Sequence, residues 1–345
     1  GEPKYVVAPM VEQSELAYRM LTRKYGAQLC YTPMFHSRMM VEDKNYKRDN
    51  FSTCPEDRPL IVQFCANDPD YLLRAAKMVE DECDAVDINL GCPQGIARRG
   101  HYGSYLLEEP DLICAMVSKL AKELKIPVTC KIRILPKEED TLNLVRRIEE
   151  AGCKLLTVHG RTRQQNKDLV GSCNWDIIKK IKETVKIPVI ANGGIHTFED
   201  VQRCLEYTGV DGVMSSESVL ENAALFSGKV YDLDDIALEY MELAKKYPTD
   251  LSYIRPHMFK FLYTGLQKHT DLREKLSKLT KPEEFIEIAQ QLKKLRENES
   301  PESKFGWYMR HRNKKTDTEK AETDTAEKKS EPELLEDFNL ELLGQ

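Results

Sequence analysis

Eight short apolar runs recur within the first 216 residues, and each run is followed by a segment with helical periodicity. Successive runs begin about 25 to 40 residues apart, which leaves room for one crossover helix and its loops. Runs that are apolar throughout are typical of parallel strands buried on both faces. The runs occupy residues 4–10, 27–34, 59–66, 85–93, 127–133, 155–161, 188–194 and 212–216.

Eight strand-helix units over about 220 residues favour a closed (β/α)8 TIM barrel over an open doubly wound sheet. An open sheet would be expected to carry a GxGxxG turn after its first strand, whereas this chain continues as "APMVEQSE". We therefore predict an α/β fold with a barrel domain over residues 1–232. In such a barrel the chemistry is expected at the carboxyl ends of the strands.

From residue 233 onward the pattern changes to helices alone, and the sequence predicts a small helical bundle over residues 233–300. Residues 301–345 are charged and are predicted to form a disordered tail. Residues 316–345 carry ten acidic residues and three lysines, so the net charge of −6 conceals a body of about +1. Charge alone therefore does not exclude a nucleic-acid partner.

The ten cysteines form no CxxC pair, which argues against a zinc site and favours free thiols in a reducing compartment. We expect a cytoplasmic or nuclear location, a monomer, and no bound metal. No apolar run approaches the roughly 20 residues that a membrane span requires, so no membrane association is expected.

Cys92 differs from the other cysteines because it lies between Gly91 and Pro93 at the end of an apolar run. No second cysteine or histidine stands at a ligand spacing, which argues against a metal site. Two roles remain open for this thiol. It can act as a nucleophile if His101 folds back as a base, or as a proton donor, since a thiol is mostly protonated at neutral pH.

Other polar residues also follow the apolar runs. Asn192, Gly193 and Gly194 precede a helix start, and their backbone N–H groups are suited to hold an anion. Lys131 and His159 stand at consecutive strand ends, where a lysine needs an electron-rich partner. The alternatives are an ordinary tight turn, a lysine with its amine in solvent, and a structural histidine.

Six motifs taken in order resemble the tRNA-dihydrouridine synthases. The chain is similar to this family over roughly residues 4–300, and the segment "GCPQGIARRGHYGSYL" most resembles the eukaryotic branch that acts on D-loop positions 16 and 17. The motifs are "APM" (8–10), "VQFCAND" (62–68), "DINLGCP" (87–93), "CKIR" (130–133), "TVHGRT" (157–162) and "ANGGI" (191–195).

The resemblance implies an enzyme that uses FMN and either NADPH or NADH to reduce the C5–C6 double bond of uridine in tRNA. Hydride would pass from the flavin N5 to C6, and Cys92 would protonate C5. The implied cofactor contacts are Ala8, Pro9, Met10, Gln63, Lys131, His159, Asn192, Gly193, Gly194, Ser216 and Glu217. The implied substrate contacts are Asn89, Arg133, Arg161, Arg98, Arg99, Arg255, His257 and Lys260.

Ser216-Glu217 departs from the family pattern, since bacterial members usually have Gly-Arg there, with the arginine on the FMN phosphate. The helical residues Arg255, His257 and Lys260 are alternatively part of a solvated helix face. The basic segment 304–315 is a further candidate for RNA binding. Two other functions stay open: a flavin barrel that acts on free pyrimidines, and a tRNA-binding protein without catalysis.

Overall fold

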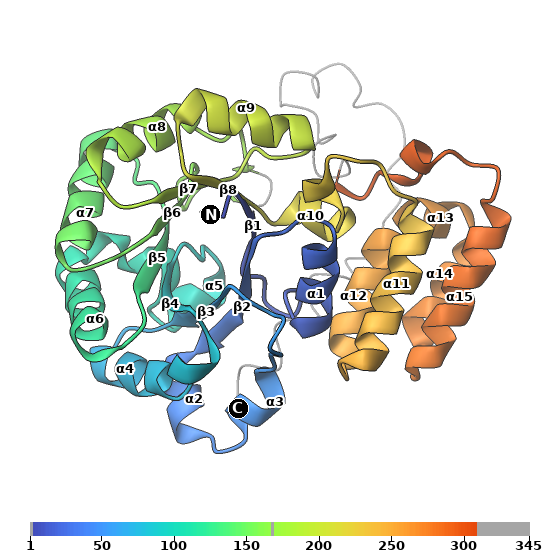
Figure 1. The fold of residues 1–345 in the computed structure, drawn as a ribbon, viewed down its shortest axis with the longest axis horizontal. Helices are drawn as coiled ribbons and strands as arrows, with labels where there is room; N and C mark the ends of the chain where they lie inside the picture. Colours follow the sequence, from blue (N-terminus) through green and yellow to red (C-terminus); the bar gives the residue numbers. More distant parts are fainter. Residues whose placement is uncertain (1–2, 167–168, 309–345) are drawn as a thin grey trace, which may run out of the picture. The chain divides into compact units, whose positions relative to one another are not determined.

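A computed structural model describes residues 3–166 and 169–308 of the chain. Eight parallel strands close into a barrel in which β1 pairs with both β2 and β8, which confirms the predicted TIM barrel (Figure 1). Every predicted apolar run overlaps one strand, although β2 extends past the end of its run to His36. The strands are β1 (Tyr5–Val7), β2 (Leu29–His36), β3 (Leu60–Cys65), β4 (Ala85–Leu90), β5 (Val128–Arg133), β6 (Leu156–His159), β7 (Val189–Asn192) and β8 (Gly212–Ser215).

Helices cover the outside of the barrel, as Figure 1 shows for the arc from α4 to α9. The main covering helices are α1 (Leu16–Lys24), α4 (Pro69–Lys77), α6 (Pro110–Glu123), α7 (Glu138–Glu150), α8 (Trp175–Thr184) and α9 (Phe198–Thr208). Shorter elements follow β2, β4 and β8: α2 (Ser37–Glu42), α3 (Tyr46–Asn50), α5 (Gly95–Arg99), the 3-10 helix η2 (Gly103–Glu108) and α10 (Glu217–Glu221).

Alternate residues of each strand point to opposite sides of the barrel wall. In β4, Val86 and Ile88 join the large apolar core between strands and helices, whereas Ala85 belongs to a separate small cluster with residues from β1, β2, β3, β7 and β8. Asp87 and Asn89 share the inward side with Ala85. The same alternation sends Thr129 and Lys131 of β5 inward, so polar side chains collect toward the open end of the barrel.

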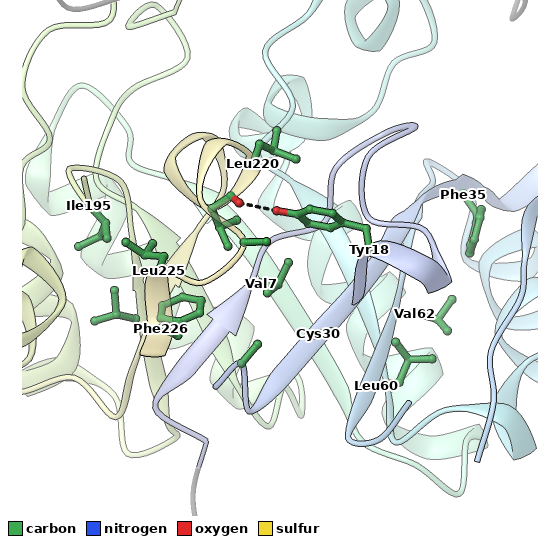
Figure 2. Packing of buried hydrophobic residues seen from close by; sticks show 14 of the residues in the cluster. Val7, Tyr18, Cys30, Phe35, Leu60, Val62, Ile195, Leu220, Leu225 and Phe226 are labelled. Carbon is green, nitrogen blue, oxygen red and sulfur yellow. Dashed lines mark hydrogen bonds between the residues drawn. The ribbon is translucent and has the colours of Figure 1, made fainter. Parts of the chain in front are cut away.

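An all-helical region follows the barrel and belongs to the same compact unit, which extends to Tyr308. It packs through α11 onto α1, and Tyr18 of α1 donates a hydrogen bond to the Val219 carbonyl oxygen of α10 (Figure 2). The division at residue 232 stays a prediction. The helices are α11 (Leu233–Lys246), α12 (Leu251–Phe261), α13 (Tyr263–Lys268), α14 (Thr270–Lys278) and α15 (Pro282–Leu295), followed by the 3-10 helix η5 (Pro301–Lys304).

The composition of residues 301–308 predicts a disordered tail, but the structure packs them against the body. Lys304 is buried and donates to Asp232 and Asp234 at 2.6 and 2.7 Å, and Trp307 is 9% exposed. The other residues of the predicted tail, 309–345, lie outside the described residues. Within the described part of the chain, no helix is long and apolar enough to cross a membrane.

Candidate active site

Five polar side chains from consecutive strands lie at the carboxyl ends of β3 to β7. The strand register sets Asn89 of β4 beside Lys131 of β5, and His159 of β6 beside Asn192 of β7. Gln63 of β3 donates to Asp87 and accepts from Asn89, both at 2.8 Å. The barrel therefore brings these predicted site residues to one mouth.

The turn that carries Cys92 is held from both sides. Asn89 Oδ1 accepts from the N–H groups of Gly91 and Cys92 at 3.0 Å each, and the Cys92 carbonyl accepts from Ser104 through its N–H and its hydroxyl. Gly103 has a φ of +66°, and a Cβ there would lie 2.8 Å from the Cys92 carbonyl oxygen. Only glycine allows η2 to approach the turn this closely.

The Cys92 thiol is half-buried, and loss of hydration raises its pKa, while Arg133 and Lys131 oppose that shift. A raised pKa keeps the thiol protonated at neutral pH, as a proton donor requires. His101, the alternative base, instead lies with its Nε2 2.5 Å from Glu109 Oε1. The geometry therefore favours the acid over the thiolate nucleophile.

Lys131 is the cation of the mouth. Burial and the nearby Arg133 lower the pKa of Lys131 to about 8, and its amine makes no hydrogen bond or ion pair with any residue described by the structure. Loss of hydration and the three neighbouring cations Lys131, Arg133 and Arg161 push the pKa of His159 well below its usual value, so this imidazole is neutral at pH 7. Arg161 Nη1 lies 3.3 Å from His159 Nε2.

Arg133 and Asn89 have partners within the protein, and their expected substrate contacts stay predictions. Arg133 is 9% exposed and donates to the carbonyl oxygens of Gly91, Thr162 and Gln165, so its guanidinium braces the mouth. Both polar ends of Asn89 are engaged within the protein, because Oδ1 holds the Cys92 turn and Nδ2 donates to Gln63. These two residues shape the site from inside.

The side of the mouth that is predicted to hold a phosphate is built from β7, β8 and β1. Gly193 and Gly194 have φ angles of +99° and +75°, and neither N–H donates a hydrogen bond to a residue within 3–166 or 169–308. Asn192 is buried and donates to the Met214 carbonyl at 3.1 Å, so its side chain supports the loop. Ser216 is partly exposed at the start of α10, and Glu217 is exposed.

The first strand ends against the same side. Ala8 is buried and its N–H donates to the Ser215 carbonyl at 3.0 Å, whereas Pro9 and Met10 are partly exposed at the rim. A flavin mononucleotide fits these residues in chemical terms. Lys131 is an unpaired cation for the electron-rich edge of the ring, and the Gly193 and Gly194 N–H groups are unused donors for a phosphate.

Arg98 and Arg99 are exposed on α5, the short helix that directly follows the Cys92 turn. Neither side chain forms a hydrogen bond or ion pair with the residues that the structure describes. They remain available for a polyanionic ligand. In the same ranges no group of three or more His, Cys, Asp or Glu side chains could hold a metal ion.

The helical residues expected to contact RNA are differently placed. His257 is fully buried, stacks on Tyr18 with ring centroids 4.3 Å apart, and lies 3.1 Å from Glu15 Oε2. Arg255 donates to the carbonyl oxygens of Leu276, Ser277 and Leu279, which end α14. The structure therefore corrects the prediction for His257, which is buried away from any ligand, whereas an RNA contact by the partly exposed Arg255 stays a prediction.

Lys260 and Trp307, which are also expected to contact RNA, have partners within the protein as well. Lys260 of α12 lies over the Trp307 ring at 5.2 Å from its centroid, and its amine donates to the Pro256 carbonyl at 3.2 Å. Trp307 is nearly buried and cannot offer its face to an RNA base in this conformation. Sequence periodicity cannot reveal the contact between Lys260 and Trp307, because these two residues come from separate segments of the chain.

Sequence reasoning also missed Asp87. This side chain is fully buried within the barrel, accepts from Thr129 Oγ1 at 2.6 Å and from Gln63 Nε2 at 2.8 Å, and burial raises its pKa to about 6. The available signal was an acidic residue in the middle of an apolar run, two positions before Asn89 and therefore on the same side of the strand.

Comparison with known proteins places the chain in a family. The sequence model of the dihydrouridine synthase family matches residues 6–331. A Mus musculus protein named as a tRNA-dihydrouridine(16/17) synthase-like protein is 50% identical over 295 residues, which cover 85% of this chain and 62% of the mouse protein. The tRNA-dihydrouridine(16/17) synthase of Saccharomyces cerevisiae is 46% identical over 310 residues, covering 85% of this chain and 73% of the yeast protein.

Solved structures add the fold. A 2-naphthoyl-CoA reductase complex aligns with a TM-score of 0.50 and 10% identity over 65% of this chain and 49% of that chain, a likeness of fold alone. The match to this chain covers less than two thirds of the length of the mouse relative. On the family match and the two relatives together, the chain belongs to the dihydrouridine synthase family.

Proposed function

We propose that this protein reduces uridine to dihydrouridine in the D-loop of tRNA, at positions 16 and 17, with FMN as cofactor and NADPH or NADH as reductant. The observation that carries the proposal is that one barrel mouth holds both a protonated thiol, Cys92, and a cation without a partner among the described residues, Lys131 on the neighbouring strand. The names of the mouse and yeast relatives support the substrate and the positions.

The chemistry divides between cofactor and protein. FMN, when bound, supplies hydride to C6 of the uracil ring. Lys131 would stabilise negative charge at the pyrimidine edge of the flavin, and the Gly193 and Gly194 N–H groups would hold the phosphate in place of the arginine that this chain lacks. Cys92 would give its proton to C5, because saturation of the double bond requires hydride at one carbon and a proton at the other.

The substrate must enter with its base exposed. A uracil stacked within a folded tRNA cannot reach a barrel mouth, so an unpaired D-loop nucleotide that can turn outward is a suitable target. Arg98 and Arg99 would contact phosphates beside the Cys92 turn and fix the tRNA without reading its sequence. All ten cysteines are free, which supports a reducing intracellular compartment as the working location.

The test uses the full-length, flavin-loaded protein with NADPH and tRNA from cells that lack their own synthases. Dihydrouridine mapped to positions 16 and 17 is the expected result. Parallel incubations with free uracil and dihydroorotate examine the small-molecule alternative. Turnover of a free pyrimidine with no product in tRNA would contradict the proposed substrate, and tRNA binding by a colourless protein would contradict the proposed chemistry.

A further inference from the structure

A buried hydrogen-bond chain runs from the interior of the barrel to the Cys92 turn. It begins at Thr129, whose hydroxyl donates to Asp87 Oδ1, and continues from Asp87 Oδ2 to Gln63 Nε2 at 2.8 Å. Gln63 Oε1 then accepts from Asn89 Nδ2 at 2.8 Å, and Asn89 Oδ1 accepts from the Gly91 and Cys92 N–H groups. Thr129, Asp87 and Gln63 are at most 2% exposed.

The direction of this chain is set from its two ends, by the Gly91 and Cys92 N–H groups, which only donate, and by the Asp87 carboxylate. Gln63 and Asn89 carry amides, and an amide can reverse its oxygen and nitrogen at little steric cost. A carboxylate only accepts hydrogen bonds, so ionised Asp87 compels Gln63 to present its nitrogen. Gln63 must then turn its oxygen toward Asn89, and Asn89 must turn its oxygen toward the Cys92 turn.

Reversal of the amides would be costly at the far end. With its nitrogen toward the turn, Asn89 would face the Gly91 and Cys92 N–H groups donor against donor, and two buried hydrogen bonds would be lost. The turn that carries the thiol would then lose its main side-chain support. Asp87 lies two amides away from Cys92, yet it selects the only arrangement in which that turn is held.

We propose that Asp87 is a positioning residue that fixes the polarity of the Gln63–Asn89 amide pair and thereby holds the Cys92 thiol in place for proton donation. The part that concerns proton donation depends on the proposed function. The positioning itself does not, since it follows from the hydrogen bonds among these four residues.

Titration of Asp87 gives the proposal a second signature. The charged or titratable groups around it are Lys131 and Cys130 of β5 and Tyr31 of β2. Burial raises the pKa of Asp87 to about 6, and the Lys131 charge opposes that rise. Below this pKa the protonated carboxyl can donate as well as accept, so it no longer dictates the orientation of Gln63.

Three variants of the full-length, flavin-loaded protein test the proposal. Asp87→Asn replaces the obligate acceptor with an amide of the same shape. Thr129→Val is the matched control, because it removes a bond to the same carboxylate and leaves the direction of Gln63 unchanged. The double variant Asp87→Asn with Gln63→Glu moves the carboxylate, which only accepts hydrogen bonds, from residue 87 to residue 63. It again forces Asn89 to present its nitrogen to residue 63.

Two measurements are made on each variant. The first is amide hydrogen exchange at Gly91 and Cys92, which needs no substrate. The second is the single-turnover rate of uridine reduction at saturating tRNA, recorded from pH 5 to 8. We expect Asp87→Asn to speed exchange at both amides, to slow reduction about 10- to 100-fold, the effect typical of a lost supporting hydrogen bond, and to flatten the decline in rate below pH 6.

The control and the double variant decide between positioning and mere stability. At pH 8, well above the Asp87 pKa of about 6, Thr129→Val should exchange and react like the parent protein, and the double variant should recover protection of both amides. Equal effects of Asp87→Asn and Thr129→Val, or unchanged protection in Asp87→Asn, would overturn the proposal. If Asp87→Asn fails to fold, Gln63→Met interrupts the same chain and must expose the same amides.

Failure of the proposed function would look different. A parent protein that makes no dihydrouridine, yet loses Gly91 and Cys92 protection on Asp87→Asn substitution, would leave the positioning role intact and remove only its assignment to uridine reduction.

Discussion

The barrel mouth and the helical region both carry basic residues, but they use them in opposite ways. At the mouth, Lys131, Arg98 and Arg99 make no ion pair with the described residues. In the helical region, Arg296 is fully buried and pairs with Asp234 at 3.0 Å, and Lys304 pairs with the same carboxylate. The second set holds the fold together, whereas the first set has no such partner among the described residues.

The difference teaches how to interpret a basic residue. A cation becomes structural when carboxylates or helix-end carbonyls from another segment reach it, as Asp234 reaches Arg296 across 62 positions of sequence. A cation has no such structural role when no carboxylate or carbonyl oxygen lies within hydrogen-bonding distance of it. Four predictions, from the largest expected effect to the smallest, can break or sharpen this distinction.

Cys92→Ala should lower the single-turnover rate of uridine reduction at least about 100-fold, because it removes the proton donor from the mouth. Cys92→Ser is the matched variant, since its hydroxyl keeps the shape but is a far weaker acid. Flavin absorbance and a tRNA gel shift serve as controls for both variants. A Cys92→Ala protein that turns over normally would remove the acid assignment altogether.

Arg296→Met should cost about 3 kcal/mol of unfolding free energy, because Asp234 would keep Lys304 as its only cation in a buried setting. Lys293→Met is the control, since Lys293 pairs with the neighbouring Asp235 but is exposed, and it should cost about 1 kcal/mol or less. Denaturant unfolding measures both. Equal costs would mean that the helical cations are not structural.

Replacing Arg98 and Arg99 together with alanine should weaken tRNA binding by about tenfold at low salt and reduce the salt dependence by about one to two released counterions. Arg255→Met should leave that salt dependence unchanged while lowering stability, because Arg255 donates to the carbonyl oxygens at the C-terminal end of α14. Binding titrations across salt concentrations provide the comparison. A reduced slope for Arg255→Met would restore the helical region as an RNA platform.

Lys131 should make stability rise with pH between about 8 and 10.5 in the flavin-free protein. Its folded pKa lies below the usual 10.5, so the unfolded chain binds more protons in that window. Bound flavin should give the Lys131 amine an electron-rich partner and raise its pKa. The unfolding free energy should then rise less steeply with pH. Unfolding of both forms across this pH range, with Lys131→Met as reference, checks it, and identical slopes would place the flavin elsewhere.

Much of the fold follows from the sequence, because buried parallel strands such as Leu60–Cys65 and Val189–Asn192 leave apolar runs that need no long-range knowledge. The mouth follows in part, since strand ends are fixed once the strands are known. The role of His257 could not be foreseen, because its partner Glu15 lies 242 positions away. Asp87 was overlooked because its apolar neighbours concealed the period-two pattern that it shares with Asn89.

The carboxylate of Glu221 on α10 accepts hydrogen bonds from the N–H groups of Gly306, Trp307 and Tyr308, more than 80 positions later in the chain. This late contact has a consequence for the order of assembly. A growing chain can pair β1 with β8 once Ser215 has been made, but the N–H donors that Glu221 holds in the folded protein are made only later, with Gly306 to Tyr308. The barrel strands can therefore pair before the segment that covers Glu221 exists. A nascent chain halted between Ser215 and Tyr308 would leave this surface open to aggregation and proteolysis.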